Sequence, residues 1–240
     1  MSTISNTSGT PVQLQISSAR ALVSVLQSIR SRAGTKQQIC SLLAGSDGLT
    51  FRWEEDAKGM QAAVFLRPEV FTKFFCEDPR RVVGLSLSVL MDTLAVFCSS
   101  AGELEIRYPG KDMELLLEAR ERLGGGAEIS SYARIRTQEP PAMRELGDYW
   151  EEPSSYFLGP GQLFKEVVED LEWSGGSVRL RMQRQPPELA FRSAAGGGAT
   201  GNGTLRVGLP VAAPGFHCAG AEADHVYPLK RLQAAFANLP

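Results

Sequence analysis

The same order of predicted strands and helices occurs twice in this chain of 240 residues, and this repeat restricts the fold more than any other feature. In each half, a short strand is followed by a helix, several strands and a second helix. The two helices begin about 68 residues apart in the first half, at Ser18 and Ser86, and about 67 apart in the second, at Gly161 and Pro228. The repeat therefore predicts two similar α+β domains.

The first half has the more complete pattern. Ser17 or Ser18 can cap a helix that runs to about Arg30, and a second apolar helix is predicted at residues 86–98. Alternation of apolar and polar residues predicts strands at 12–16, 37–43, 49–53, 61–66, 81–85, 103–108, 113–119 and 127–136. The aromatic residues on these elements are predicted to lie in the core: Phe51, Trp53, Phe65, Phe71, Phe74, Phe75 and Phe97.

The second half starts again after a segment that is rich in proline and acidic residues. A strand at 154–158 and a helix at 161–173 are predicted first, then strands at 178–183, 188–193 and 204–209, and a last helix at 228–239. By the logic of the repeat, this half lacks the final strands of its domain. We therefore expect the chain to be a fragment, a short isoform or the product of an incomplete gene model.

These patterns divide the chain into four parts. Residues 1–10 are predicted to be a disordered tail, 11–137 the first domain, 138–153 a linker, and 154–240 an incomplete second domain. The tail has no basic start followed by an apolar stretch, so it does not resemble a signal peptide. The apolar stretches are too short to cross a bilayer, which takes about 20 residues.

The residues that catalysis would need are sparse. Cys40, Cys76, Cys98 and Cys218 are far apart in apolar contexts, which indicates reduced thiols of an intracellular protein. A metal site at His217, Cys218 and His225 is disfavoured because adjacent residues of a strand point to opposite faces. The glycine clusters lack the lysine of a phosphate-binding loop. We therefore predict no catalytic residue, no cofactor and no metal.

Carboxylates are the one open alternative, because a two-metal nuclease needs several acidic groups that converge. Glu166, Glu169 and Asp170 lie close together in the sequence, on one predicted helix. We interpret them as a solvated helix face, since their spacing is not that of a metal-binding motif.

Several segments resemble a known family. Residues 85–100 and 18–29 are similar to its two first-domain helices, and residues 133–140 to the point where that domain enters the linker. Residues 60–65 and 216–218 add to the likeness, which covers about residues 12–239 and is weakest at 183–215. The family is that of the Rad-one subunits of the heterotrimeric nine-one-one DNA-damage checkpoint clamp, within the sliding clamps related to the proliferating cell nuclear antigen.

The resemblance implies a sliding-clamp fold, with two similar domains whose antiparallel sheets lie outside and whose helices lie inside. It also implies a non-enzymatic nuclear protein that encircles double-stranded DNA at damage sites and supports checkpoint signalling and repair. The implied partners are the Rad-nine and Hus-one clamp subunits and a clamp loader similar to replication factor C. A homotrimeric replication clamp and a 3′–5′ exonuclease stay open as alternatives.

A clamp needs basic residues on its inner helices, where they offset phosphate charge loosely enough to permit sliding. The candidates to face DNA are Arg20, Arg30, Lys165, Lys230 and Arg231. The second helix offers no Lys or Arg, and the third carries more acidic than basic residues.

Clamp subunits join through edge strands. We expect residues 113–119 to form the edge of the first domain and 204–209 that of the second. The corresponding candidate interface residues are Met113, Leu115, Leu117, Leu205 and Val207. Aromatic residues near the linker, Tyr149, Trp150, Tyr156 and Phe157, are candidates either for docking a partner peptide or for anchoring the linker.

Overall fold

In the computed structural model, the chain divides into two compact units, Met1–Met143 and Arg144–Pro240. The structure describes residues 12–30, 38–76, 81–99, 102–122, 128–144, 153–171, 176–185, 187–194, 206–210, 217–220 and 222–237. The predicted tail at 1–10 lies outside these residues. The division between the units falls inside the segment predicted as a linker, 138–153.

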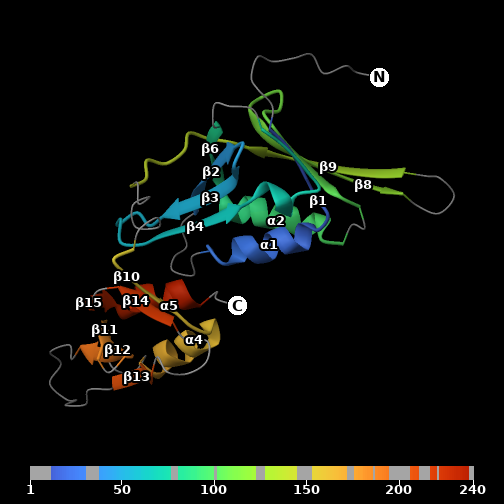
Figure 1. Ribbon diagram of the computed structural model, residues 1–240. Coiled ribbons are helices and arrows are strands. Elements are labelled where there is room, and N and C mark those ends of the chain that lie inside the picture. The colour runs from blue at the N-terminus through green and yellow to red at the C-terminus, as the bar shows by residue number, and fades with distance from the viewer. Residues whose placement is uncertain are drawn as a thin grey trace. The chain divides into compact units, whose positions relative to one another are not determined.

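Unit one contains two antiparallel sheets (Figure 1). The five-stranded sheet has the order β5 (Lys73–Cys76), β1 (Val12–Ile16), β7 (Leu104–Tyr108), β8 (Glu114–Arg122) and β9 (Glu128–Arg136). The four-stranded sheet has the order β4 (Gln61–Leu66), β3 (Gly48–Glu54), β2 (Ile39–Gly45) and β6 (Arg81–Ser86).

Two helices complete unit one, and serine caps set where they begin. The Ser18 hydroxyl accepts a hydrogen bond from the Ala21 N–H at 3.2 Å and caps α1 (Ala19–Gln27). The Ser86 hydroxyl accepts one from the Val89 N–H at 3.4 Å and caps α2 (Leu87–Phe97). α1 and α2 contact each other, and a short 3-10 helix, η1 (Pro68–Val70), links β4 to β5.

A single apolar core joins both sheets and both helices of unit one. Its fully buried side chains include Leu26 of α1, Cys40 of β2, Leu90 of α2 and Leu117 of β8. Burial raises the pKa of the Cys40 thiol to about 12, so it stays protonated near neutral pH. Cys40 is therefore part of the apolar core rather than a nucleophile.

Unit two repeats the same plan. Helix α4 (Gly161–Asp170) and helix α5 (Leu229–Phe236) contact each other. They pack on a four-stranded antiparallel sheet of order β13 (Arg206–Pro210), β12 (Pro187–Ala194), β11 (Ser177–Arg184) and β15 (Ala223–Pro228). A separate pair joins β10 (Ser155–Leu158) to β14 (His217–Gly220). In unit one β1 has a neighbour on each side, whereas among the described residues β10 pairs with β14 alone.

The core of unit two is built around aromatic rings. The Phe164 ring lies 5.7 Å from that of Phe157, 5.5 Å from Phe236 and 6.5 Å from the fully buried Phe191, measured between centroids. Val168, Leu229 and the inward residues of the sheet surround this cluster. One cluster of phenylalanines, centred on Phe164, thus joins β10, both helices and β12.

The α+β class is confirmed, and each predicted helix is present with slightly different bounds. Three strands were not predicted: β5, β14 and β15. β14 and β5 have four residues each, too few to establish an alternation, and the residues of β15 are mostly exposed. No helix in the described part of the chain has the length and apolar character that a membrane span requires.

The start of the predicted linker is attached to unit one. The Gly84 N–H donates to the Gln138 carbonyl at 2.9 Å, and the Gln138 N–H donates to the Gly84 carbonyl at 2.8 Å. The Lys58 ammonium, in the β3–β4 turn, donates to the Ala142 carbonyl at 2.8 Å. A Cβ on Gly84 would lie 2.6 Å from the Glu139 carbonyl oxygen, so the close approach of this segment requires glycine.

Candidate nucleic-acid interface

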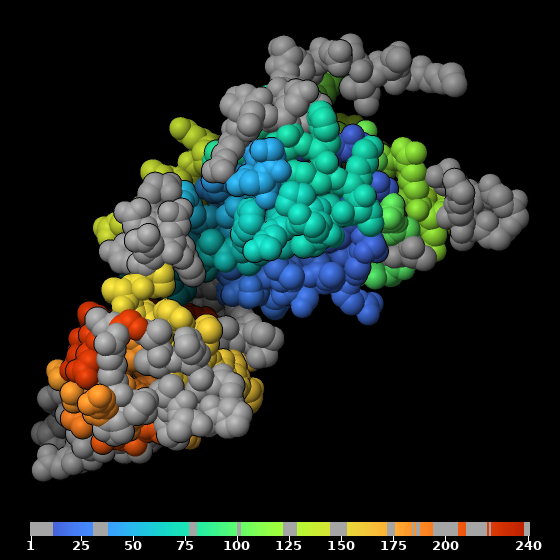
Figure 2. All heavy atoms as spheres, in the orientation of Figure 1, coloured from blue at the N-terminus to red at the C-terminus, as the bar shows by residue number. Residues whose placement is uncertain are grey.

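In unit one the candidate DNA-facing residues lie on the exposed side of α1 and just beyond its end. Arg20 is exposed in the first turn of this helix, and Arg30 is exposed just beyond its end. Figure 2 shows the segment that contains α1, in blue, at the surface of unit one. The apolar side of α1, with Leu22 and Leu26, is buried in the core, so the packing directs both arginines outward.

Helix α2 contributes no positive charge to this surface. Its exposed residues include Val89, Asp92 and Val96, and the Val96 side chain is 70% exposed. Among the described residues, the two helices and the end of α1 therefore offer two arginines and one aspartate. Such a surface can make only a few phosphate contacts, which suits weak binding that is independent of base sequence.

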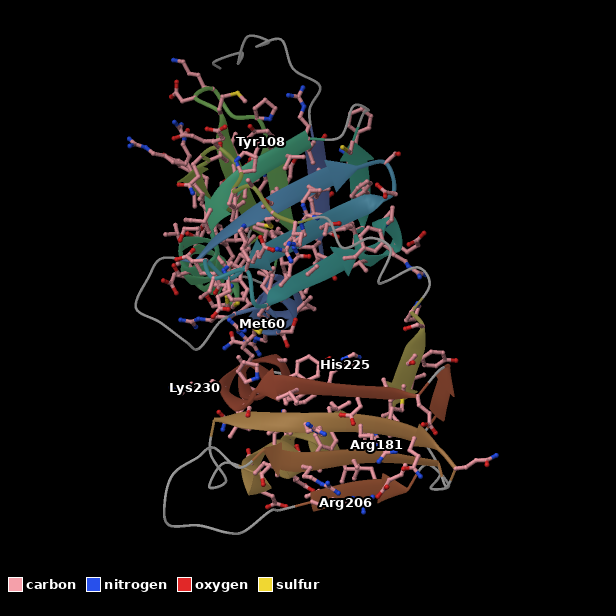
Figure 3. All side chains as sticks on the ribbon, turned by 90° about the vertical axis from the view of Figure 1, so that its left-hand side faces the viewer. Met60, Tyr108, Arg181, Arg206, His225 and Lys230 are labelled. Carbon is pink, nitrogen blue, oxygen red and sulfur yellow. The ribbon has the colours of Figure 1, made fainter. Side chains whose placement is uncertain are left out.

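In unit two the basic residues are divided unequally between the helices. Lys165 of α4 is half-buried and lies beside the exposed acidic residues Glu166, Glu169 and Asp170. On α5, which carries Lys230 (labelled in Figure 3), Lys230 is exposed. The next residue, Arg231, is half-buried. Among the described residues, the more favourable surface for phosphate in this unit is that of α5.

The acidic side of α4 also bears on the nuclease alternative. The Gln162 amide donates a hydrogen bond to the Glu166 carboxylate at 3.2 Å, an ordinary contact along a helix. Within the described ranges, no group of three His, Cys, Asp or Glu side chains is close enough to hold a metal ion. These carboxylates therefore lie on the helix surface without the converging geometry of a two-metal site.

The prediction that residues 113–119 form the edge strand of unit one is wrong. β8 lies inside the five-stranded sheet, between β7 and β9, so both sides of its backbone are paired. Leu115 and Leu117 are buried in the core, and Met113 lies in the turn before the strand, where its carbonyl accepts a hydrogen bond from the Thr137 hydroxyl. The run of three leucines at 115–117 is typical of an interior strand and could have indicated this position.

The edge on this side of the sheet is β9. Its Ile129 side chain is 49% exposed and its Tyr132 side chain is 73% exposed. The face of β9 is tied to the sheet through Glu118 of β8, whose carboxylate accepts hydrogen bonds from Arg107 at 2.6 Å, Arg120 at 2.7 Å and Ser130 at 3.2 Å.

The Arg120 hydrogen bond is the main cause that lowers the pKa of Glu118 below its usual range, so this carboxylate stays ionised. The ladder between β8 and β9 and the contacts of Glu118 hold β9 in place. β9 therefore presents an ordered backbone edge.

In unit two the strand predicted at 204–209 does lie at an edge, because β13 pairs only with β12 among the described strands. The Val207 side chain packs against the core of the unit instead of pointing away from it. Leu205 lies outside the described residues. Any pairing at this edge would use the backbone of β13 rather than the Val207 side chain.

Two phenylalanines that were predicted to lie in the core are exposed instead. One of them belongs to a row of mostly apolar residues on the outer face of a sheet. Phe65 of β4 is 50% exposed, and Phe75 of β5 is 43% exposed. Cross-strand pairs place Phe65 opposite Thr50, Thr50 opposite Leu43, and Leu43 opposite Val82, which is 44% exposed. This outer row (Phe65, Thr50, Leu43 and Val82) lies on the sheet whose β6 edge holds the start of the linker.

The other candidates for peptide docking are less well placed. Tyr149 and Trp150 lie outside the described residues. Phe157 packs in the core of unit two, which fits the anchoring interpretation, and Tyr156 is 39% exposed on β10. The side chains of His217 and Cys218 are also outside the described part of the structure.

Comparison with known proteins adds two findings. The family model for the repair proteins Rad1/Rec1/Rad17 matches residues 13–207. The cell cycle checkpoint protein RAD1 of Mus musculus is 25% identical over 138 residues, which cover 55% of this chain and 48% of that protein. The chain thus spans about half the length of the curated relative that it matches.

Proposed function

Because this chain belongs to the Rad1/Rec1/Rad17 family of repair proteins, we propose that it is a subunit of a ring-shaped checkpoint clamp that encircles DNA. The observation that carries the proposal is the repeated unit itself: each unit has a pair of adjacent helices packed on antiparallel sheet. The family match favours a checkpoint clamp over a replication clamp.

In this proposal the protein acts by topology rather than by chemistry. A closed ring stays on DNA without reading bases, so its inner surface needs only a few flexible basic side chains near the phosphates. Arg20, Arg30, Lys165, Lys230 and Arg231 would supply them from α1, the end of α1, α4 and α5. No catalytic residue and no cofactor take part, and the protein would work in the nucleus.

Ring closure would use the two edges described above. β9 and β13 both offer backbone N–H and C=O groups on one side, and an extended strand of a neighbouring subunit can pair with such an edge. The partners would be subunits of the Rad-nine and Hus-one type, and a loader related to replication factor C would place the ring on DNA. The outer row of Phe65, Thr50, Leu43 and Val82 would dock apolar side chains of partner peptides.

The DNA contacts predict a measurable salt effect. Replacing Lys230 and Arg20 together with glutamine, in the ring assembled with its two partner subunits, is expected to weaken binding to every duplex alike. Each lost phosphate contact should lower the slope of log K against log salt by about 0.9. Fluorescence anisotropy on two duplexes of unrelated sequence, between 50 and 200 mM salt, measures both effects.

Arg67 provides the matched control, since it is exposed at the start of η1 and lies on neither α1 nor α5. The Arg67→Gln ring should bind as the unchanged ring does. If the Arg20→Gln, Lys230→Gln double variant has the same slope as the unchanged ring, these two residues do not contact DNA. Weakening that depends on base sequence would contradict binding by encirclement.

A further inference from the structure

The outer face of the unit-two sheet, opposite the helices, carries a row of like charges. Cross-strand register places Arg206 of β13 opposite Arg192 of β12, and Arg192 opposite Arg179 of β11. Arg181 lies two residues along β11 from Arg179, on the same face. Residues of the opposite face, such as Val178 and Leu189, pack in the core with α4 and α5. Figure 3 labels Arg181 and Arg206 on this sheet.

Local acids neutralise only half of these charges. Arg206 forms an ion pair with Glu188, and the Arg179 guanidinium lies 3.7 Å from the Asp224 carboxylate. Among the described residues, the exposed side chains of Arg181 and Arg192 have no ion pair or hydrogen bond. Their same-face neighbours on β12 and β13 include the uncharged Ala190 and Gly208, whereas on β15 Asp224 lies opposite Arg181 and is the acid that faces Arg179. The face therefore has two excess positive charges, although the whole chain has a net charge of −2.

Such a row is unfavourable for the isolated fold, because like charges that are directly opposite on adjacent strands repel each other. The repeat does not require it. In unit one the corresponding face, on β4, β3, β2 and β6, has the apolar row that contains Phe65, and its next row has Arg52 as its only arginine. The arginines are thus a property of unit two alone, where they oppose stability and suit the binding of an anion.

We propose that Arg179, Arg181, Arg192 and Arg206 form a docking face for an extended acidic peptide segment of a partner protein. Arginine, rather than lysine, is suited to carboxylates because its planar fork binds them with two parallel hydrogen bonds, and the described strands of this sheet contain no lysine. Arg181 and Arg192 are diagonal neighbours about 7 Å apart, and alternate side chains of an extended peptide have nearly the same spacing.

The same face is poorly suited to nucleic acid. Single-stranded DNA or RNA binds through aromatic side chains on which the bases stack, and the outward residues described on this sheet include none. Glu188 and Asp224 would also repel a continuous phosphate backbone, whereas a peptide with a few separated carboxylates can avoid them. This inference does not depend on DNA encirclement, because the face lies on the side of the sheet away from α4 and α5.

Fluorescence anisotropy on the full chain at low salt provides the test. The probe is a fluorescein-labelled peptide of five Glu-Gly repeats, compared with five Gln-Gly repeats, a 20-nucleotide oligothymidine and a 20-base-pair duplex. The chain should bind the glutamate peptide and not the glutamine peptide. The double variant R181Q/R192Q should lose at least tenfold in affinity, whereas R67Q should match the unchanged chain.

Removing Arg181 and Arg192 breaks no described ion pair, so the double variant should unfold at the same temperature as the unchanged chain or higher. Four results would overturn the proposal: no binding of the glutamate peptide, equal binding of the glutamine peptide, an equal loss in R67Q, or binding of oligothymidine or duplex through the same two arginines in place of the peptide.

Discussion

A proline on the outward side of β9 is expected to weaken ring assembly strongly while the free chain stays folded. In an antiparallel edge strand, successive residues direct their N–H groups alternately to the neighbouring strand and to solvent. Of the adjacent residues Tyr132 and Ala133, one therefore bonds to β8 and the other faces outward. Proline at the outward position costs the free chain little but removes a donor at the subunit boundary. The lost hydrogen bond leaves a carbonyl of the neighbouring strand without a donor, which should cost about 1–3 kcal/mol and weaken assembly by roughly tenfold to a hundredfold.

Thermal unfolding of the free chain distinguishes the two variants, Tyr132→Pro and Ala133→Pro. The variant with the inward proline breaks the β8–β9 ladder and should unfold at a lower temperature. Assembly with the two partner subunits is then measured by size-exclusion chromatography with light scattering. Ala62 and Ala63 on the edge strand β4 provide the control, and the outward proline there should leave assembly unchanged. A β9 variant that stays folded and assembles normally would exclude β9 as the subunit boundary.

The second large effect is expected in the core of unit two. Phe191 is fully buried on β12, and its ring lies 6.5 Å from that of Phe164. Phe191→Ala should lower the free energy of unfolding of unit two by about 3–5 kcal/mol, through lost burial and the cavity that it leaves. This is a large part of the ~5–15 kcal/mol that stabilises a whole domain. The unfolding temperature of unit two should fall by roughly 10–30 °C.

Phe75→Ala is the matched control, because Phe75 is 43% exposed on β5 and the same substitution removes less burial. Its cost should be about 1 kcal/mol or less. Differential scanning calorimetry with near-ultraviolet circular dichroism can follow both variants. Similar losses in the two proteins would mean that the described core of unit two is wrong.

The helices could be predicted from the sequence because the signals that define them are local. A serine cap followed by an apolar stripe fixes the start and the buried side of α1 within a dozen residues. Strand order is different, since it depends on which distant segments pair. The sequence predicted strands for both β8 and β9, but only the register shows that β8 is interior and β9 is the edge.

The exposed aromatics show a related limit of sequence patterns. Alternation divides a strand into two faces but does not say which face meets the core, and both can carry a phenylalanine. Phe65 and Phe51 lie on neighbouring strands, yet Phe51 is buried and Phe65 is half exposed on the opposite face. The outer apolar row could therefore not be predicted, because the sequence pattern assigned Phe65 to the core.

The arginine face depends even more on tertiary structure. Arg179, Arg192 and Arg206 are far apart in the sequence and follow no motif. They form one row only because β11, β12 and β13 pair in a register that aligns them. The five candidate DNA-facing residues, in contrast, are all on predicted helices, which are local features that a helical period in the sequence can indicate.

Retention on circular DNA is the most direct test of the proposed clamp. The ring, assembled with its two partner subunits, is loaded onto a nicked circular plasmid by a clamp loader and washed at high salt, which removes proteins held only by phosphate contacts. We expect the ring to remain on the circle and to leave when a restriction enzyme opens the plasmid. Equal loss from circular and linear DNA under the same wash would show that the protein does not encircle the duplex.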